Sequence, residues 1–265
     1  MDVRFRDDQL TAYLRNGFVT VPKLLDTESS QLLRNIAKAD AAIQHDRAGR
    51  DDGEGGTVEL VVRNEVSDDT IYGAVVRSAG IVRRMEQLLD GEVYHYHHKM
   101  ILKEPRIGGA WAWHQDYGYW YDNGCLLPLL ASCMIAVDRA TRENGCLQVL
   151  RGSHLMGRMN HGPVGDQTGA DPERVAAAMD RFDTVYCELE PGDAVFFDCN
   201  LLHRSDQNKS DNARWAFIAC YNAARNDPYK DSRHPRYAPL EVWPDERIQE
   251  IGREQWQQLQ SGSQD

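Results

Sequence analysis

Residues 93–117 read VYHYHHKMILKEPRIGGAWAWHQDY, and this stretch decides the fold. An aromatic and aliphatic run ends at a turn that contains proline and glycine, and a second short run follows, which is typical of strands joined by turns. The same alternation continues downstream and predicts strands at residues 93–102, 111–117, 132–138, 146–150, 185–188, 194–198 and 215–221. Many short strands at this spacing favour a mainly β fold with flanking helices, either a double-sheet jelly roll, the double-stranded β-helix of cupin-like proteins, or a related barrel.

The residues before this stretch follow a different pattern. Apolar residues at helical spacing predict helices at 7–16 and 26–44, and the second helix has Asp26 or Thr27 as its N-cap. A short apolar run at 17–22 predicts a strand between them.

Three more helices and one loop complete the predicted elements. Helices are expected at 80–89, over about ten residues from Asp171, where Pro172 occupies the first helical position, and at 245–259. The charged, glycine-rich stretch 45–56 predicts a loop. We expect a single domain over residues 1–265, made of a helical N-terminal part (1–92), a jelly-roll core (93–225) and a C-terminal extension (226–265).

The composition is that of a globular protein, with 42% hydrophobic and 27% charged residues. No apolar run approaches the roughly 18 residues that a membrane helix needs, and the first residues lack a secretory signal, so we expect a cytoplasmic protein. A net charge of −11 argues against a nucleic-acid partner. The six cysteines have no metal-binding or disulfide spacing and are expected to be small buried hydrophobes. The expected partner is a small molecule.

A candidate metal site lies in the second run of the opening stretch. His114 and Asp116 are two residues apart, so on a strand both side chains point to the same face. A lone histidine, His203, follows a Pro-Gly-Asp turn and an apolar run, and we expect it on a neighbouring strand. Two imidazoles and one carboxylate are the ligands of non-haem iron(II) oxygenases.

Arg214 and Ser205 add an anion-binding pair to this pattern. Arg214 opens the apolar strand that follows His203, and a guanidinium at the mouth of a barrel is suited to bidentate binding of a carboxylate. Ser205 supplies a hydroxyl donor for the same anion. A metal chelated by one end of a dicarboxylate, with an arginine and a serine at the other end, describes a 2-oxoglutarate site.

The chain resembles the phytanoyl-CoA dioxygenase family of iron(II)- and 2-oxoglutarate-dependent oxygenases over about residues 10–225. Three blocks in the family's order carry the resemblance: Trp113-His114-Gln115-Asp116, residues 143–154 (ENGCLQVLRGSH), and residues 191–214 from Pro191-Gly192-Asp193 to Arg214. The resemblance implies the cofactor iron(II), the cosubstrate 2-oxoglutarate and O2, with release of succinate and CO2.

Residue roles follow from the same resemblance. It makes His114, Asp116 and His203 the catalytic metal ligands, and Arg214 with Ser205 the anchor for the far carboxylate of 2-oxoglutarate. It also implies that Gln115 and Lys99 lie beside the cosubstrate. Halogenating relatives replace the carboxylate at position 116 with a small residue, so its presence favours hydroxylation.

The substrate side is expected to include aromatic residues near the metal motif. Tyr117 and Trp120 are the predicted pocket wall, because ectoine hydroxylases, a branch of the same family, carry aromatic residues at these places. The rest of that branch's signature is absent, so ectoine is not predicted as the substrate. The sequence has no clear basic cluster for the phosphates of coenzyme A, which favours a small polar metabolite. The insert at 156–182 is either a lid or a passive surface excursion.

Two alternatives remain open at this point. A non-redox cupin-like isomerase or binding protein could use the histidines to bind zinc or nickel, but it would have no use for Arg214 with Ser205. A catalytically silent binding module of the same fold would give no metal-dependent succinate formation.

Overall fold

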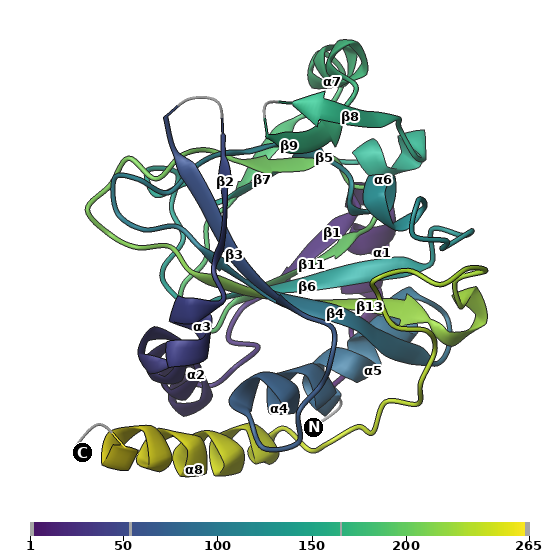
Figure 1. The fold of residues 1–265 in the computed structure, drawn as a ribbon. Coiled ribbons are helices and arrows are strands. Elements are labelled where there is room, and N and C mark those ends of the chain that lie inside the picture. Colours follow the sequence, from purple (N-terminus) through teal and green to yellow (C-terminus); the bar gives the residue numbers. More distant parts are fainter. Residues whose placement is uncertain (1–2, 53–54, 165, 263–265) are drawn as a thin grey trace.

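Two antiparallel sheets form the centre of the computed structural model, which describes residues 3–52, 55–164 and 166–262 (Figure 1). The larger sheet has the strand order β1-β11-β6-β13-β4-β3-β2, and the smaller has the order β10-β7-β12-β5. With the flanking helices, this arrangement confirms the predicted mainly β, jelly-roll fold class.

The strands of the larger sheet are β1 (Phe18–Val21), β2 (Ala48–Asp51), β3 (Thr57–Arg63), β4 (Val93–Leu102), β6 (Leu130–Ala136), β11 (Ala194–Asp198) and β13 (Ala216–Ala223). Those of the smaller sheet are β5 (Trp111–His114), β7 (Leu147–Leu150), β10 (Thr184–Cys187) and β12 (His203–Ser205). A separate hairpin consists of β8 (His161–Val164) and β9 (Gln167–Ala170).

The helices are α1 (Asp7–Asn16), α2 (Thr27–Ala39), α3 (Ala41–His45), α4 (Ile71–Arg77), α5 (Ala79–Leu88), α6 (Asp116–Trp120), α7 (Pro172–Met179) and α8 (Glu246–Gly262), with short 3-10 turns η1 (Ser153–Met156) and η2 (Ala224–Asn226). Figure 1 shows α2, α4 and α8 along one face of the larger sheet. Among the described residues, no helix combines the length and apolar character needed to cross a membrane.

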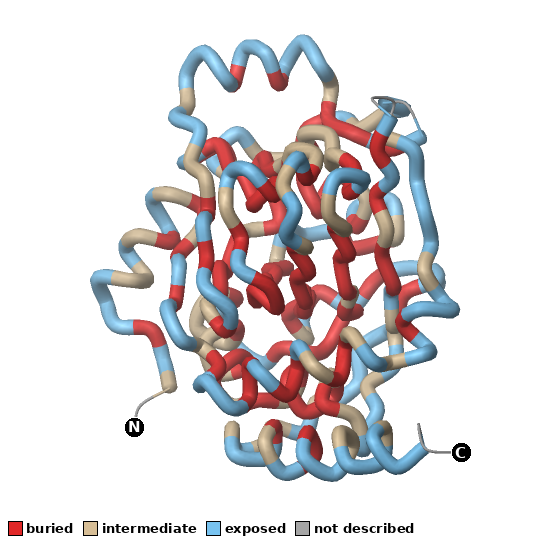
Figure 2. The backbone as a smooth tube through the Cα atoms, turned by 90° about the vertical axis from the view of Figure 1, so that its left-hand side faces the viewer, coloured by how far each residue is buried: buried red, intermediate tan, exposed pale blue. Residues whose placement is uncertain are grey.

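The central strands of the larger sheet are buried on both faces, and Figure 2 shows the buried backbone gathered at the centre of the molecule. On β13, Phe217 and Ala219 belong to the core shared with the helices, whereas Ile218 and Cys220 belong to the core between the sheets. Alternate residues of a strand point to opposite faces, so a strand covered on both sides is apolar throughout. This is why the sequence showed continuous apolar runs. All six cysteines are buried and free, as predicted.

The predicted helix at 26–44 is divided in two. Asp26 caps α2 as expected, with its side chain accepting a hydrogen bond from the Ser29 backbone N–H at 2.8 Å. Asp40 has an extended backbone, and its carboxylate accepts the Ala42 N–H at 2.9 Å. An aspartate that caps a new helix interrupts the old one, because its side chain competes for backbone donors.

The prediction of a loop at 45–56 is wrong for part of that stretch. Residues Ala48–Asp51 form β2, which pairs with β3, and residues 53–54 lie outside the described part of the chain. All four residues of β2 are exposed because the strand lies at the edge of the sheet. An edge strand without a buried face has no hydrophobic alternation, so the sequence carried no signal for it.

Candidate metal centre

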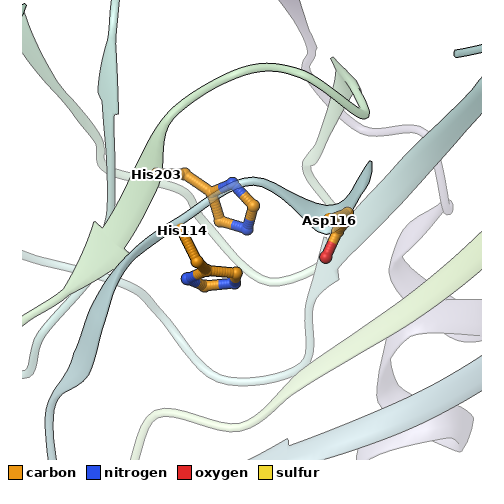
Figure 3. A group of neighbouring side chains, drawn as sticks. All are labelled: His114, Asp116 and His203. Atoms are coloured by element: carbon orange, nitrogen blue, oxygen red, sulfur yellow. The ribbon is translucent and has the colours of Figure 1, made fainter. Parts of the chain in front are cut away.

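The two candidate imidazole ligands lie opposite each other on paired strands. His114 is the last residue of β5 and His203 the first of β12, and the two are register partners in the smaller sheet. Their ring centroids are 4.1 Å apart. Figure 3 shows both rings directed toward the carboxylate of Asp116. Strand pairing therefore brings together two histidines that are far apart in the sequence.

Asp116 lies beside the two histidines, but it is not on the predicted strand. The predicted strand 111–117 ends at His114, and Asp116 is the first residue of α6. The Tyr117 N–H donates to the Cys199 carbonyl at 2.9 Å, which turns the chain away from the sheet. Asp116 therefore does not share a strand face with His114, and that prediction is wrong. Even so, His114, Asp116 and His203 each offer one ligand atom, and these atoms all lie within 4.8 Å of one another.

The hydrogen bonds of the two histidines fix which ring nitrogen is free. Nδ1 of His114 lies 2.8 Å from the Ala112 carbonyl, and Nδ1 of His203 lies 2.9 Å from the Leu201 carbonyl. A carbonyl can only accept, so both Nδ1 atoms carry the proton and both Nε2 atoms keep a lone pair for a cation. Burial lowers the pKa of His114 and that of His203, so both imidazoles are neutral at pH 7.

Asp116 is held as a carboxylate. Burial alone would raise its pKa, but Lys99 and the two imidazoles, together with a hydrogen bond from Ser132, bring the pKa below its ordinary value. The Ser132 hydroxyl donates to Oδ2 at 3.0 Å, and Nζ of Lys99 lies 3.9 Å from Oδ1. Two neutral imidazoles and one ionised carboxylate form a donor set that fits iron(II).

A cavity between the sheets adjoins these three side chains. Its lining residues are Lys99, Ile101, Trp111, His114, Met134, Leu147, His203, Arg204, Ser205, Arg214 and Ile218. The structure thus places Lys99, Ser205 and Arg214 in one cavity with two of the candidate ligands, and all three were predicted to contact the cosubstrate.

Arg214 is the strongest indication of what this cavity binds. Its side chain is 3% exposed, one terminal nitrogen donates to the Gly145 carbonyl, and Nε has no hydrogen-bond partner. Burial lowers the Arg214 pKa to about 10, so the group is still a cation at pH 7. A buried cation with an unused donor is costly unless an anion pairs with it. A carboxylate ligand would supply that partner.

Gln115 does not line this cavity, although it was predicted to lie beside the cosubstrate. Its side-chain amide donates to the carbonyls of Gly157 and Asn200 at 2.8 and 2.7 Å and accepts the Met159 N–H at 2.7 Å. The side chain is fully buried, and these three bonds occupy it. Gln115 therefore fastens neighbouring segments together.

The two aromatic residues predicted for the pocket wall lie on α6, outside the lining of the cavity. The Tyr117 hydroxyl donates to the carbonyls of Cys125 and Leu126 at 3.1 and 2.7 Å. The Trp120 ring stands edge-on to His97, with ring centroids 5.8 Å apart. Trp120 thus adjoins residues on β4, while Tyr117 is held by the turn after its own helix.

The insert at 156–182 contacts the peptide between two of the candidate metal ligands. The Gln115 backbone N–H donates to Nε2 of His161 at 2.9 Å, and Nδ1 of His161 lies 2.9 Å from the Met159 carbonyl. The Gln167 side chain bonds to the backbone of Ala110 and Ala112 on both sides of Trp111. The hairpin β8–β9 therefore continues the wall of the smaller sheet beside the site.

Sequence reasoning missed several of these residues. Ser132 contacts Asp116 from β6, and His161 contacts Gln115 from the insert. Neither residue lies in a motif, and only the pairing of distant segments brings each to the site. His203 was expected on a neighbouring strand, and it opens β12, but the bounds of β12 were not predicted because three residues with a polar middle position give no periodic pattern.

Comparison with known proteins gives one family match. Residues 13–216 match the sequence model of the family described as phytanoyl-CoA dioxygenase (PhyH). An L-proline trans-4-hydroxylase from Streptomyces griseoviridis is 27% identical over 244 residues, covering 86% of this chain and 90% of that protein. An ectoine dioxygenase from Bordetella parapertussis is 26% identical over 251 residues, covering 86% and 80%.

Solved structures show the same fold. Crystal structures of EctD from S. alaskensis, one with 2-oxoglutarate and 5-hydroxyectoine and one with bound Fe, superpose with TM-scores of 0.76 and 0.77. Sequence identities are 21% and 22%, and both alignments cover 91% of this chain and 88% of the other.

Proposed function

The chain belongs to the phytanoyl-CoA dioxygenase family, and we propose on this basis that it is an iron(II)- and 2-oxoglutarate-dependent dioxygenase that hydroxylates a small polar metabolite. One observation carries the proposal. Three buried ligand atoms within 4.8 Å of one another adjoin a cavity that contains the buried guanidinium of Arg214, whose Nε lacks a partner. A bound metal would be held by the three ligand atoms, and a bound carboxylate would pair with Arg214.

The metal ligands are Nε2 of His114, Nε2 of His203 and the carboxylate of Asp116. Such a set covers one face of an octahedral ion and leaves adjacent positions for a chelating cosubstrate and O2. When bound, iron(II) with 2-oxoglutarate supplies the oxidising chemistry, in which O2 is consumed, succinate and CO2 are released and a C–H bond becomes C–OH.

The protein positions the cosubstrate. Arg214 and Ser205 hold the far carboxylate of 2-oxoglutarate, because both line the cavity and Arg214 is a buried cation. Lys99 lies beside Asp116 at the metal end of the same cavity. Gln115 contributes through the segments that it fastens, rather than by contact with the cosubstrate.

We propose that the substrate binds on the side of α6, because Asp116 is the first residue of this helix. Trp120 and Tyr117 support this side of the site, and Trp120 contacts β4. The named relatives act on L-proline and ectoine, which are small and polar, and we propose the same kind of substrate here. The carboxylate at position 116 supports hydroxylation as the outcome.

We also propose that residues 1–265 form one catalytic domain and that the enzyme works in the cytoplasm. Helices near both ends share a single core with the larger sheet, which supports one domain. Six buried cysteines without a disulfide are typical of a reducing compartment.

An anaerobic titration of the protein with iron(II) and 2-oxoglutarate tests the function. The metal-bound cosubstrate should give a weak visible charge-transfer band, followed by succinate formation on admission of air. Arg214→Ala should weaken 2-oxoglutarate binding by about 10- to 100-fold, since a hydrogen bond to a charged group is lost. His203→Ala should abolish the band.

The exposed residues Arg139 and His45 provide matched controls, and their alanine variants should behave as wild type. A wild-type protein that gives neither the band nor succinate is not this oxygenase. A zinc- or nickel-binding isomerase would bind a metal and leave 2-oxoglutarate unbound.

A further inference from the structure

Strand β4 runs along the site, from the proposed cosubstrate end near Lys103 to an opposite end near His97. The Arg214 N–H donates to the Lys103 carbonyl at 2.8 Å, so Arg214 lies at the Lys103 end of this strand. Lys99 pairs with Ile218, and His97 pairs with Cys220 further along. Residues two apart share a face of a strand, so His97 follows Lys99 on the side away from Arg214.

Four rings form a cluster at that end, which we call the ring cluster: Tyr96, His97, Trp120 and His234. The His234 ring stacks on Tyr96 at 4.7 Å between centroids and lies 4.9 Å from His97. His97 is 4% exposed, and its Nδ1 has no hydrogen-bond partner. A buried imidazole nitrogen without a partner is unusual and indicates a place for a polar ligand atom.

His234 comes from a part of the chain that the family match does not include. The match ends at residue 216, and His234 lies in the segment between β13 and α8. That segment is anchored where the Asn64 side chain donates to the Arg233 carbonyl at 2.7 Å and accepts from Nδ1 of His234 at 3.2 Å. An amide oxygen only accepts, so His234 keeps its Nε2 lone pair free.

The electrostatics of the ring cluster are positive on the side of Lys99. Lys99 acts electrostatically on both His97 and His234, and Arg233 adds a second positive charge beside His234. Burial and these charges lower the pKa of His97 well below its usual value and that of His234 to about 4. At pH 7 the cluster thus offers a cation, neutral imidazoles with a free acceptor, and aromatic faces.

We propose that the substrate is a small amino acid whose carboxylate faces Lys99 and whose amino group faces the ring cluster, with His97 and His234 as specificity-determining residues. This inference rests on the proposed function and deepens it. Lys99 complements a carboxylate. The free acceptor of His234 and the faces of Trp120 and Tyr96 complement an ammonium group through a hydrogen bond and cation–π contact.

The test uses matched sets of small molecules with the iron-loaded protein. The panel contains the proteinogenic amino acids and pipecolic acid, each beside its amide and its analogue without the amino nitrogen. Succinate release without any addition reports on the oxygenase itself, and stimulated release reports on the substrate. At least one amino acid should stimulate release, with kcat/KM about tenfold or more above that of either analogue.

His97→Phe and His234→Phe keep a ring in place and remove the nitrogens. Each should lower kcat/KM for the amino acid by about tenfold. His234→Gln restores an acceptor and should recover part of the loss. The exposed-site variant His45→Ala should match wild type throughout.

The outcomes separate the two proposals. Amides or nitrogen-free analogues that work as well as the amino acids, a panel in which no amino acid is turned over, or ring variants with unchanged kcat/KM each overturn this inference and leave the oxygenase in place. A wild-type protein that releases no succinate under any condition overturns the proposed function, and this inference with it.

Discussion

The backbone N–H of Gln115 donates to Nε2 of His161 at 2.9 Å, which ties the peptide between two proposed metal ligands to the insert. The bond orients His114 and Asp116 relative to each other without contact with the metal. We therefore expect His161→Phe to weaken iron(II) binding by about 10- to 100-fold, the range found when groups that support metal ligands are removed. Equilibrium competition with a chelator measures the affinity for iron(II).

The control is His154→Ala, because His154 is bonded to the Leu14 carbonyl and not to the Gln115 peptide. Equal affinities in the two variants would contradict a supporting role for His161.

Ser132 offers a second test of ligand support. Its hydroxyl donates to Oδ2 of Asp116, the oxygen that Lys99 does not approach. Ser132→Ala should weaken iron(II) binding by about tenfold or more, because the carboxylate loses a fixed hydrogen bond. The same chelator competition detects the change, with the exposed Ser261→Ala as control. An unchanged dissociation constant would show that the Ser132 hydroxyl does not support Asp116 as a ligand.

Gly118 is required by the close approach of the insert. A Cβ atom there would overlap the His161 ring, whereas a Cβ at Gly162, in the same hairpin as His161, would meet nothing within 4 Å. Gly118→Ala should lower the free energy of unfolding by about 1–3 kcal/mol, the usual cost of overpacking. Gly162→Ala should change it by less than about 0.5 kcal/mol. Urea denaturation of both variants makes the comparison, and equal stabilities would mean that the insert does not dock in solution.

Buried neutral histidines predict a stability that falls in mild acid. Burial is the main cause that lowers the pKa of His98 and that of His234 to about 4, while an unfolded histidine titrates near 6.5. Between those values the unfolded chain binds more protons, so the free energy of unfolding decreases as the pH falls from 6.5 toward 4. Each group contributes up to about 1.4 kcal/mol per pH unit. Urea denaturation between pH 4.5 and 7.5 measures the slope.

His98→Gln isolates one of these contributions, because glutamine does not titrate. The variant should be less sensitive to pH than wild type over the same window, whatever its stability at pH 7. The exposed Ser261→Ala variant, which removes no titratable group, should retain the wild-type slope. If His98→Gln does not change the slope of the unfolding free energy against pH, other groups cause the acid sensitivity.

The sequence allowed prediction of those parts of the site that depend on residue type and order. Two histidines, an aspartate and an arginine follow short apolar runs, and strand pairing needs only those runs to bring them together. The continuous apolar pattern of β13 likewise predicted a strand correctly. In contrast, Asp116 lies on a helix, because a hydrogen bond from Tyr117 to a distant carbonyl outweighs the local β pattern.

Other features had no local signal. The exposed edge strand β2 lacks an apolar face on which a pattern could depend. Gln115 was predicted to contact a ligand, yet its amide is taken up by three backbone groups from segments far along the chain. His97 and His234 meet only after folding, at a sequence separation that no motif spans.

The pairing of His114 with His203 across β5 and β12 gives a bound ion a second effect. Coordinated by both rings, the ion would act as a clip across two strands that are 89 positions apart (203 − 114). The ion binds the two strands only when they are paired, so its binding free energy adds to the stability of the paired state. Metal binding should therefore slow the local opening of the smaller sheet. In metal-free protein, the amide protons of the smaller sheet should exchange with solvent faster than those of the larger sheet.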